Sequence, residues 1–173
     1  MIPYIRYDGV PTFKDSDIIE LWNRMEQDGT IKAAMFDGSI VDAEDFLRRA
    51  NTPGNFLVLV YWEDELMGIG WCNTFQGNFC QGHWCTFKHI WGNRTAIREC
   101  LTFGMNYILN SLGLDMILCI IPKRNAAAIR TSIGAGCKLQ GELPHGCFNA
   151  ETGKSETSVF LTYTKDEENE SNN

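Results

Sequence analysis

Histidine and cysteine are the side chains of this sequence best suited to proton transfer or nucleophilic attack. An imidazole titrates near neutrality, and His83, one of three histidines, is our first candidate for a general base. The seven cysteines form no C-x-x-C pair and match no zinc spacing with the histidines, so we predict no metal site. Cys147 lies near His145 without a third partner, which argues against a thiol hydrolase.

Positive charge is concentrated in one part of an acidic chain. The formal net charge is −7, yet residues 76–141 carry seven bases and two acids, a local balance of +5. Such a region suits a compact polyanionic ligand, whereas the overall negative charge argues against binding along a nucleic acid. The same bases also fit ordinary exposed helix positions, and composition does not decide between these interpretations.

The elements that position these residues follow from the hydrophobic patterns. We predict a single domain over residues 1–165 and a disordered acidic tail over residues 166–173. A first strand near residues 4–7 precedes two amphipathic helices, at 17–25 and 42–50, with Asp17 and Asp42 as their caps. No apolar run approaches the length of a membrane span, and no secretory signal is predicted, so we expect a cytoplasmic protein with reduced thiols.

The second half of the chain is patterned more clearly. Three strands should form an antiparallel meander: 55–61, 66–74 and 79–87. A long helix then runs from Gly92 to Gly113, and the apolar run 115–121 predicts a central strand. A helix opening at Asn125 is followed by a strand, a polar Gly-rich loop and a last strand, at 137–143, 144–156 and 157–164. The predicted class is α+β with a mixed sheet, in the order β-α-α-β-β-β-α-β-α-β-β.

The block LGLDMILCIIPKRNAAAIRTSIGAGCKLQGEL, with the meander and long helix before it, resembles the GCN5-related N-acetyltransferases (GNAT). The shared spacing is N-x-x-A-x-R, then a Gly-containing turn, then G-x-L, and it falls on Asn125, Ala128, Arg130, Gly136, Gly141 and Leu143. Cys137 stands where that family usually has Phe. More narrowly, HWCTFKHIWGNRTAIREC resembles acetyltransferase-like proteins of tailed-phage genomes.

The resemblance implies direct transfer of acetyl from acetyl-coenzyme A (acetyl-CoA) to a primary amine. The cofactor would lie between the fourth and fifth predicted strands, with its pantetheine arm along main-chain groups near residues 85–88, including Thr86 and Lys88. Its diphosphate would meet the free amides and positive dipole end of the long helix, at Gly92, Asn93, Arg94, Thr95 and Ala96.

Two of these positions have alternative interpretations. Arg94 replaces a small residue of the family pattern, and its side chain either adds a charge-assisted phosphate contact or blocks close approach. Asn125 stands where the family places a side chain near the cofactor, but Asn is also a good helix N-cap. The two roles of Asn125 are compatible.

The catalytic assignments also depend on the resemblance. His83 would accept the ammonium proton, or it is simply a hydrogen-bonded strand histidine. Many relatives place a Tyr acid seven residues after the helix Asn, and Ser132 occupies that position here. Glu142 and His145 are candidates for the acceptor side.

The expected partners are acetyl-CoA and an unidentified small-molecule or protein amine, with a homodimer left open. The departures at Arg94 and Ser132 motivate a rival hypothesis. In that hypothesis the chain is a non-catalytic structural or phage assembly protein that keeps the fold.

Overall fold

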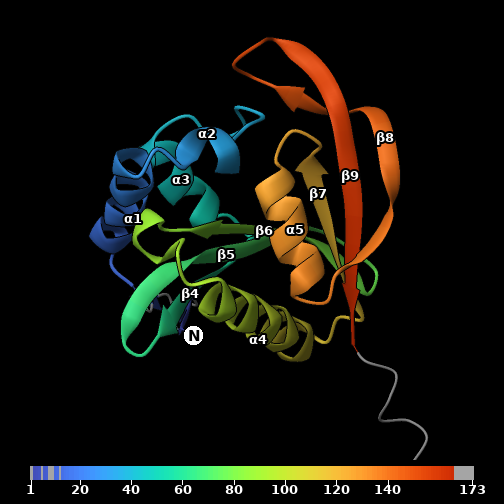
Figure 1. Ribbon diagram of the computed structural model, residues 1–173. Coiled ribbons are helices and arrows are strands. Elements are labelled where there is room, and N and C mark those ends of the chain that lie inside the picture. The colour runs from blue at the N-terminus through green and yellow to red at the C-terminus, as the bar shows by residue number, and fades with distance from the viewer. Residues whose placement is uncertain (1, 5, 8–9, 12, 166–173) are drawn as a thin grey trace, which may run out of the picture.

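The computed structural model describes residues 2–165 apart from positions 5, 8, 9 and 12. Over this range a seven-stranded mixed sheet is covered by helices on both faces (Figure 1). The acidic tail predicted for residues 166–173 lies outside the described residues. No helix in the described part is both long and apolar enough to cross a membrane.

The sheet consists of two antiparallel groups of strands. The first group pairs in the order β1 (Ile2–Tyr4), β4 (Phe56–Trp62), β5 (Glu65–Gln76) and β6 (Phe79–Thr86). The second pairs in the order β7 (Met116–Pro122), β9 (Lys154–Thr164) and β8 (Lys138–Asn149). Strands β6 and β7 run parallel and join the groups. The predicted meander and the interior position of the apolar strand β7 are confirmed.

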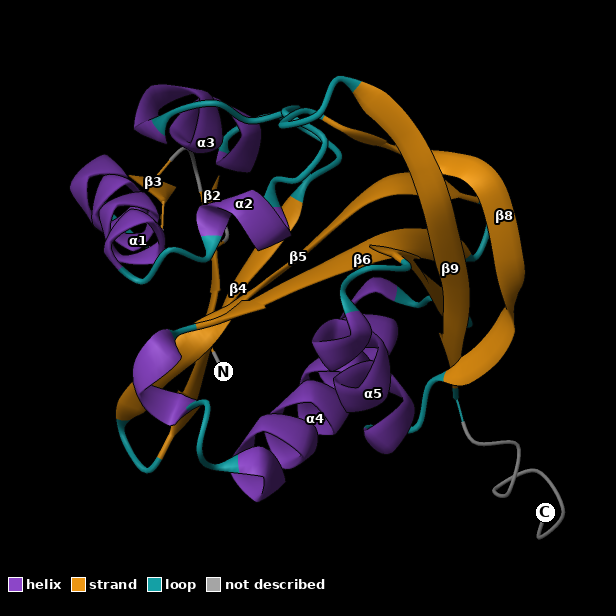
Figure 2. Cartoon of the chain, turned by 45° about the horizontal axis from the view of Figure 1, so that its top comes forward, coloured by secondary structure: helices purple, strands orange, loops and turns teal. Residues whose placement is uncertain are grey.

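The helices form two layers (Figure 2). One layer contains α1 (Asp15–Gln27), α2 (Ile31–Ala34) and α3 (Ala43–Ala50), and it shares a core with the first strand group. The other contains α4 (Arg94–Leu112) and α5 (Ala126–Gly134). Its core takes side chains from both strand groups, including Val58 of β4 and Leu161 of β9. Helix α4 therefore stabilises the junction of the two groups.

Local sequence explains where α4 begins and ends. The side chain of Asn93 accepts the backbone N–H of Ala96 at 3.1 Å, which makes Asn93 the N-cap. At the other end Gly113 adopts a left-handed conformation with φ of 64°, the usual helix-ending role of glycine. Both ends agree with the predicted helix.

The structure also differs from the predicted elements. The strand predicted near residues 4–7 corresponds to the end of β1 and to β2 (Arg6–Tyr7). The pairing of β2 with β3 (Val10–Pro11) and the short helix α2 were not predicted. Asp17 is not the cap of α1, because the helix begins at Asp15 and the Asp17 carboxylate accepts the backbone N–H of Lys14. The segment predicted as a polar loop belongs mainly to β8 and β9, which continue past an irregularity in their register between Leu143 and Cys147.

We expect Leu109→Ala to destabilise the protein by about 2–5 kcal/mol, because Leu109 of α4 is fully buried and its truncation leaves a cavity. The matched control is Phe103→Ala on the same helix, where the ring is 58% exposed, and it should cost less than about 1 kcal/mol. Urea unfolding at equilibrium measures both. Equal losses would contradict the placement of α4 against the sheet.

Candidate functional site

The two strand groups separate shortly after they meet. Strands β6 and β7 pair over only three described positions, from Phe79 opposite Met116 to Gln81 opposite Leu118. Beyond this point β6 continues to Thr86 along β5, and β7 continues to Pro122 along β9. A Cβ on Gly82 would lie 2.4 Å from the Ile117 side chain, so glycine is needed where the strands begin to diverge.

The edge of β6 that faces the gap carries unused hydrogen-bonding groups. Phe87 donates its backbone N–H to the Met67 carbonyl on β5 at 2.8 Å. Because backbone groups alternate along a strand, those of Thr86 and Trp84 point the other way, toward the gap. The Thr86 carbonyl accepts the Trp91 indole N–H at 3.4 Å, so the Trp84 backbone groups and the Thr86 N–H are the ones left for a ligand. The indole N–H of Trp84 is also buried without an acceptor in the described structure. An extended ligand with amide groups would satisfy such an edge.

The N-terminus of α4 opens beside this gap. Within the described structure the backbone N–H groups of Gly92, Arg94 and Thr95 have no hydrogen-bond acceptor. The N–H of Asn93 is donated to the Ile90 carbonyl, and that of Ala96 to the Asn93 side chain. Three of the five predicted cradle amides are therefore available. The amides of Asn93 and Ala96 are not available, because the Ile90 carbonyl and the helix cap use these donors.

A groove of about 580 Å³ runs between β6, β7, α4 and α5. It is lined by five of the ten predicted site residues, namely His83, Thr86, Arg94, Asn125 and Ser132. The side chain of Asn125 also accepts the N–H of Ala128 at 3.2 Å, so it caps α5 while it faces the groove. Helix starts were the sequence signal that located Arg94 and Asn125.

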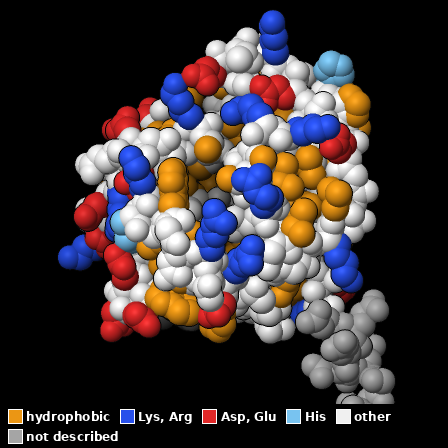
Figure 3. Space-filling view, in the orientation of Figure 1, with side chains coloured by type: hydrophobic (Ala, Val, Ile, Leu, Met, Phe, Trp, Pro, Cys, Tyr) orange, Lys and Arg blue, Asp and Glu red, His pale blue; other side chains and the backbone are white. Residues whose placement is uncertain are grey.

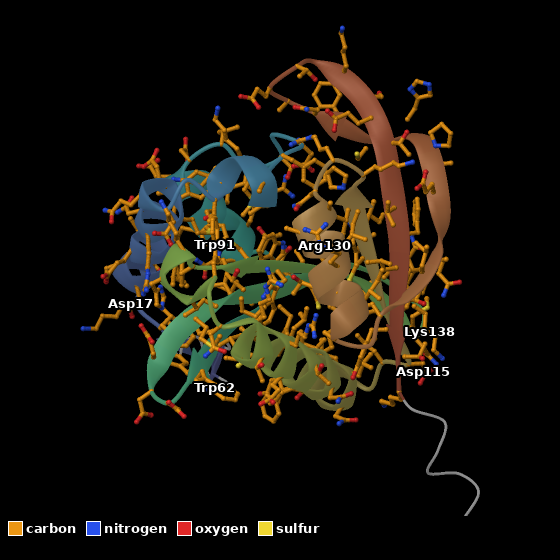
Figure 4. The ribbon with its side chains drawn as sticks, viewed as in Figure 1. Asp17, Trp62, Trp91, Asp115, Arg130 and Lys138 are labelled. Carbon is orange, nitrogen blue, oxygen red and sulfur yellow. The ribbon has the colours of Figure 1, made fainter. Side chains whose placement is uncertain are left out.

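Three arginines give the groove its charge. Arg94 was a predicted site residue, whereas Arg98 and Arg130 were seen only as part of the basic region. Figure 3 shows basic side chains gathered at the centre of this face around hydrophobic ones. Trp91 is 50% exposed and also lines the groove. Figure 4 shows Trp91 and Arg130 on either side of it. The spacing of Arg94 and Arg98, one helical turn apart, was a signal that sequence reasoning missed.

Lys88 and the histidines outside β6 do not contribute to the groove. The backbone N–H of Lys88 lies in a short 3₁₀ turn and is donated to the Asp28 carboxylate at 2.7 Å, so it is not free for a ligand. The His89 imidazole contacts the Glu65 carboxylate at 3.0 Å and Arg24 at 3.0 Å. The continuous β6 edge therefore ends at Thr86.

His83 is held in a defined orientation on β6. Its ring stacks on Trp71 with centroids 5.0 Å apart, and its Nε2 lies 3.2 Å from Oδ1 of Asn73. Because an amide oxygen only accepts hydrogen bonds, Nε2 carries the proton and Nδ1 keeps its lone pair. Burial lowers the pKa of His83 to about 4, although the carboxylate of Asp37 opposes the shift. The imidazole is therefore neutral at neutral pH, and it is a weaker base than the sequence suggested.

A second cavity, of about 400 Å³, lies on the other side of His83. Its walls come from the segment between α2 and α3, the ends of β5 and β6, and the β8–β9 hairpin. Five residues line both the groove and this cavity: Ala34, Phe36, Trp71, His83 and Ile120. The two predicted acceptor-side residues, Glu142 and His145, line neither space. Glu142 pairs with Lys123 at 2.7 Å, and the neighbours Gly146 to Phe148 take part instead.

Buried thiols form part of the groove wall. A hydrogen bond with Cys137 and burial raise the pKa of Cys119 well above its ordinary value, and a hydrogen bond with Cys80 and burial raise the pKa of the Cys72 thiol. These groove thiols therefore stay protonated and do not supply a thiolate nucleophile. Among the described residues no group of three or more His, Cys, Asp or Glu could hold a metal ion.

Comparisons with known proteins establish the fold. No family model matches the sequence, and no curated protein matches it significantly. Among solved structures, the ribosomal-protein-S5-alanine acetyltransferase of Vibrio fischeri is 14% identical with a TM-score of 0.69, over 90% of this chain and 91% of that one. The Vibrio cholerae spermidine N-acetyltransferase, solved with CoA and spermine, is 12% identical with a TM-score of 0.66, over 93% and 92%.

A Salmonella typhimurium protein solved with its cofactor acetyl-CoA is 15% identical, with a TM-score of 0.66 over 90% of this chain and 92% of that one. Similar structures also include acetyltransferases of the GNAT family from Streptococcus pneumoniae and Bacillus anthracis. The chain therefore has the GNAT acetyltransferase fold, as the sequence resemblance implied. Sequence identities this low establish the fold and nothing beyond it.

We expect the His83 imidazole to titrate near pH 4 in the folded protein, because burial disfavours its charged form. NMR of the ring, assigned by comparison with His83→Gln, measures the midpoint. The unfolded chain, with an imidazole pKa near 6.5, binds more protons between about pH 6.5 and 4. This contribution therefore lowers the free energy of unfolding as pH falls through that window. A folded-state midpoint of about 6.5 would contradict the buried site.

Proposed function

We propose that the protein is an N-acetyltransferase that moves acetyl from acetyl-CoA directly to a primary amine. The observation that carries this proposal is the gap between β6 and β7, where an unpaired strand edge leads to the free amides of the α4 N-terminus. These two features suit the two halves of coenzyme A, an amide-containing arm and a diphosphate. Neighbours of the same fold solved with CoA or acetyl-CoA support the same ligand.

Different residues of the groove would contact different parts of the cofactor. The backbone groups of Trp84 and the backbone N–H of Thr86 face the gap and would pair with the pantetheine amides. The N–H groups of Gly92, Arg94 and Thr95 would bind the diphosphate at the positive end of the α4 dipole. The guanidinium groups of Arg98 and Arg130 add positive charge for the remaining phosphate. The Arg94 side chain lines the same groove, so of its two interpretations we favour the one in which it contacts a phosphate.

The bound thioester supplies an activated acetyl group, and the chain's own residues bring the amine to it. The amine reaches His83 from the second cavity, and Nδ1 accepts a hydrogen bond from one amine N–H, which orients the lone pair of the amine nitrogen. The nitrogen bonds to the carbonyl carbon as the carbon–sulfur bond breaks. The departing sulfur takes one amine proton, and the proton of the original ammonium goes to solvent.

Ser132 faces the same groove at the position expected for the acid. Its hydroxyl would donate a hydrogen bond to the departing sulfur, without having to ionise. His83 in this scheme contacts the substrate but does not store the ammonium proton, because its lowered pKa makes it too weak a base at neutral pH.

Other features of the proposal rest on the sequence. The tailed-phage origin, the cytoplasmic location, a homodimer and the absence of a nucleic-acid partner all stay predictions. The single domain over residues 1–165 is part of the same proposal. The complex of the Vibrio cholerae spermidine N-acetyltransferase with spermine supports an amine as the class of acceptor.

Gly92→Glu should weaken acetyl-CoA binding at least about tenfold, or about 1.4 kcal/mol, because it places a carboxylate beside the proposed diphosphate site. Gly92→Ala is the matched control. A Cβ at Gly92 would have no neighbour within 4 Å, so alanine should leave the affinity unchanged. Isothermal titration calorimetry of both variants and the parent with acetyl-CoA measures the effect.

A micromolar complex of the parent protein would correspond to roughly −8 kcal/mol. If the parent shows neither heat nor a thermal shift at about millimolar acetyl-CoA, about −4 kcal/mol, the enzymatic proposal is wrong and the non-catalytic interpretation is favoured. Equal affinities of the parent and Gly92→Glu would remove the diphosphate site from the α4 N-terminus.

A further inference from the structure

The β8–β9 hairpin forms one side of the second cavity, and its tip reaches the segment after α2 (Figure 1). The backbone N–H of Ala150 donates to the Phe36 carbonyl at 2.9 Å, and Lys32 pairs with Glu151 at 2.8 Å. A Cβ on Gly38 would lie 2.8 Å from the Cβ of Ala150, so the tip and this segment are in close contact. The cavity has a volume of about 400 Å³, which lies at the small end of ligand cavities.

Charge in this cavity is sparse and balanced. Among the described residues that line it, Asp37 and Arg49 alone carry a formal charge at neutral pH. Both form hydrogen bonds with Ser39. The Asp37 carboxylate accepts the Ser39 backbone N–H at 3.1 Å and the Ser39 hydroxyl at 2.9 Å. Arg49 donates to the Ser39 carbonyl at 3.4 Å. The single carboxylate can pair with one ammonium group of a ligand. The guanidinium repels any further cationic group.

The rest of the wall is divided between polar side chains, at Asn55, Asn73, Thr74 and Gln81, and a group of apolar ones. Buried side chains of Met35, Ile40, Phe46 and Leu57 line it, and the Phe148 ring of the hairpin completes it. The Trp71 ring lies at the end that opens to the groove. A carboxylate and an aromatic face in the same cavity favour a cation, whereas the apolar side chains favour an uncharged hydrocarbon or ring.

We propose that this cavity binds the acceptor, and that the acceptor is a small primary monoamine with an apolar body. The inference rests on the proposed acetyl transfer. The ammonium group pairs with Asp37 next to His83, and the body lies against the apolar wall. A polyamine would bring additional positive charge to Arg49 and to apolar side chains, so the chain discriminates against polyamines although a protein of the same fold acetylates spermidine.

The test compares phenethylamine with spermidine as acceptors for the full-length protein at saturating acetyl-CoA. Release of the CoA thiol gives initial rates, and mass spectrometry identifies the acetylated amine. We expect kcat/KM to be at least about tenfold higher for phenethylamine, a difference of about 1.4 kcal/mol. The same preparation is titrated calorimetrically with acetyl-CoA, so that cofactor binding is measured independently.

Asp37→Asn tests the proposed ammonium site directly, because it removes the charge while an amide oxygen can still accept from Ser39. It should raise KM for phenethylamine at least about tenfold and leave the acetyl-CoA affinity unchanged. Glu44→Gln is the matched control. Glu44 is an exposed carboxylate of α3 that does not line the cavity, so both constants should stay as in the parent.

The outcomes separate the two proposals. If acetyl-CoA binds but spermidine is the equal or better acceptor, or neither amine is acetylated, the monoamine inference is overturned and the cofactor site stands. An unchanged KM in Asp37→Asn likewise rejects the ammonium site. If acetyl-CoA does not bind, the acetyl-transfer proposal fails and the inference fails with it.

Discussion

The structure depends on a parallel ladder that stops after three residue pairs. Each strand at the junction is held from its outer side, β6 by five described pairs with β5 beyond the divergence and β7 by its full ladder with β9. The strands can therefore separate without either becoming disordered. Helix α4 packs across both groups, and the Tyr163 hydroxyl of β9 donates to Asn106 of α4 at 3.0 Å. A gap results, and of the backbone groups that face it only the Thr86 carbonyl has an acceptor role within the described structure, toward the Trp91 indole and the Cys85 thiol.

Most of the fold could be predicted because its strongest signals are local. The apolar run of β7, the period of α4 and the caps Asn93 and Asn125 each fix an element by nearby residues. The continuation of β8 beyond Leu143 has no such signal. Its residues are mostly exposed, and His145 adopts a left-handed backbone with φ of 58° within the irregular register, so polar composition suggested a loop.

The site residues that have a local sequence signal could also be predicted. Helix starts and the family spacing located Arg94, Asn125 and Ser132, which face the groove. Asp37 could not be found in this way, because it acts on His83 only through packing of the segment after α2 against β6. Nor could sequence show that Ala96 and Lys88 use their backbone donors elsewhere, since the acceptors are a helix cap and the distant Asp28.

The groove and the second cavity meet at His83, and the protonation state of this residue determines the charge at their junction. The groove carries three guanidinium groups, whereas the cavity beyond His83 carries one positive and one negative charge. A cation approaching through the groove would meet repulsion from Arg94, Arg98 and Arg130, but one approaching through the cavity would not. A charged imidazole at the junction would extend the positive field into the cavity. Burial against Trp71 keeps His83 uncharged at neutral pH, so a polyanion and an amine can reach the same point from opposite sides.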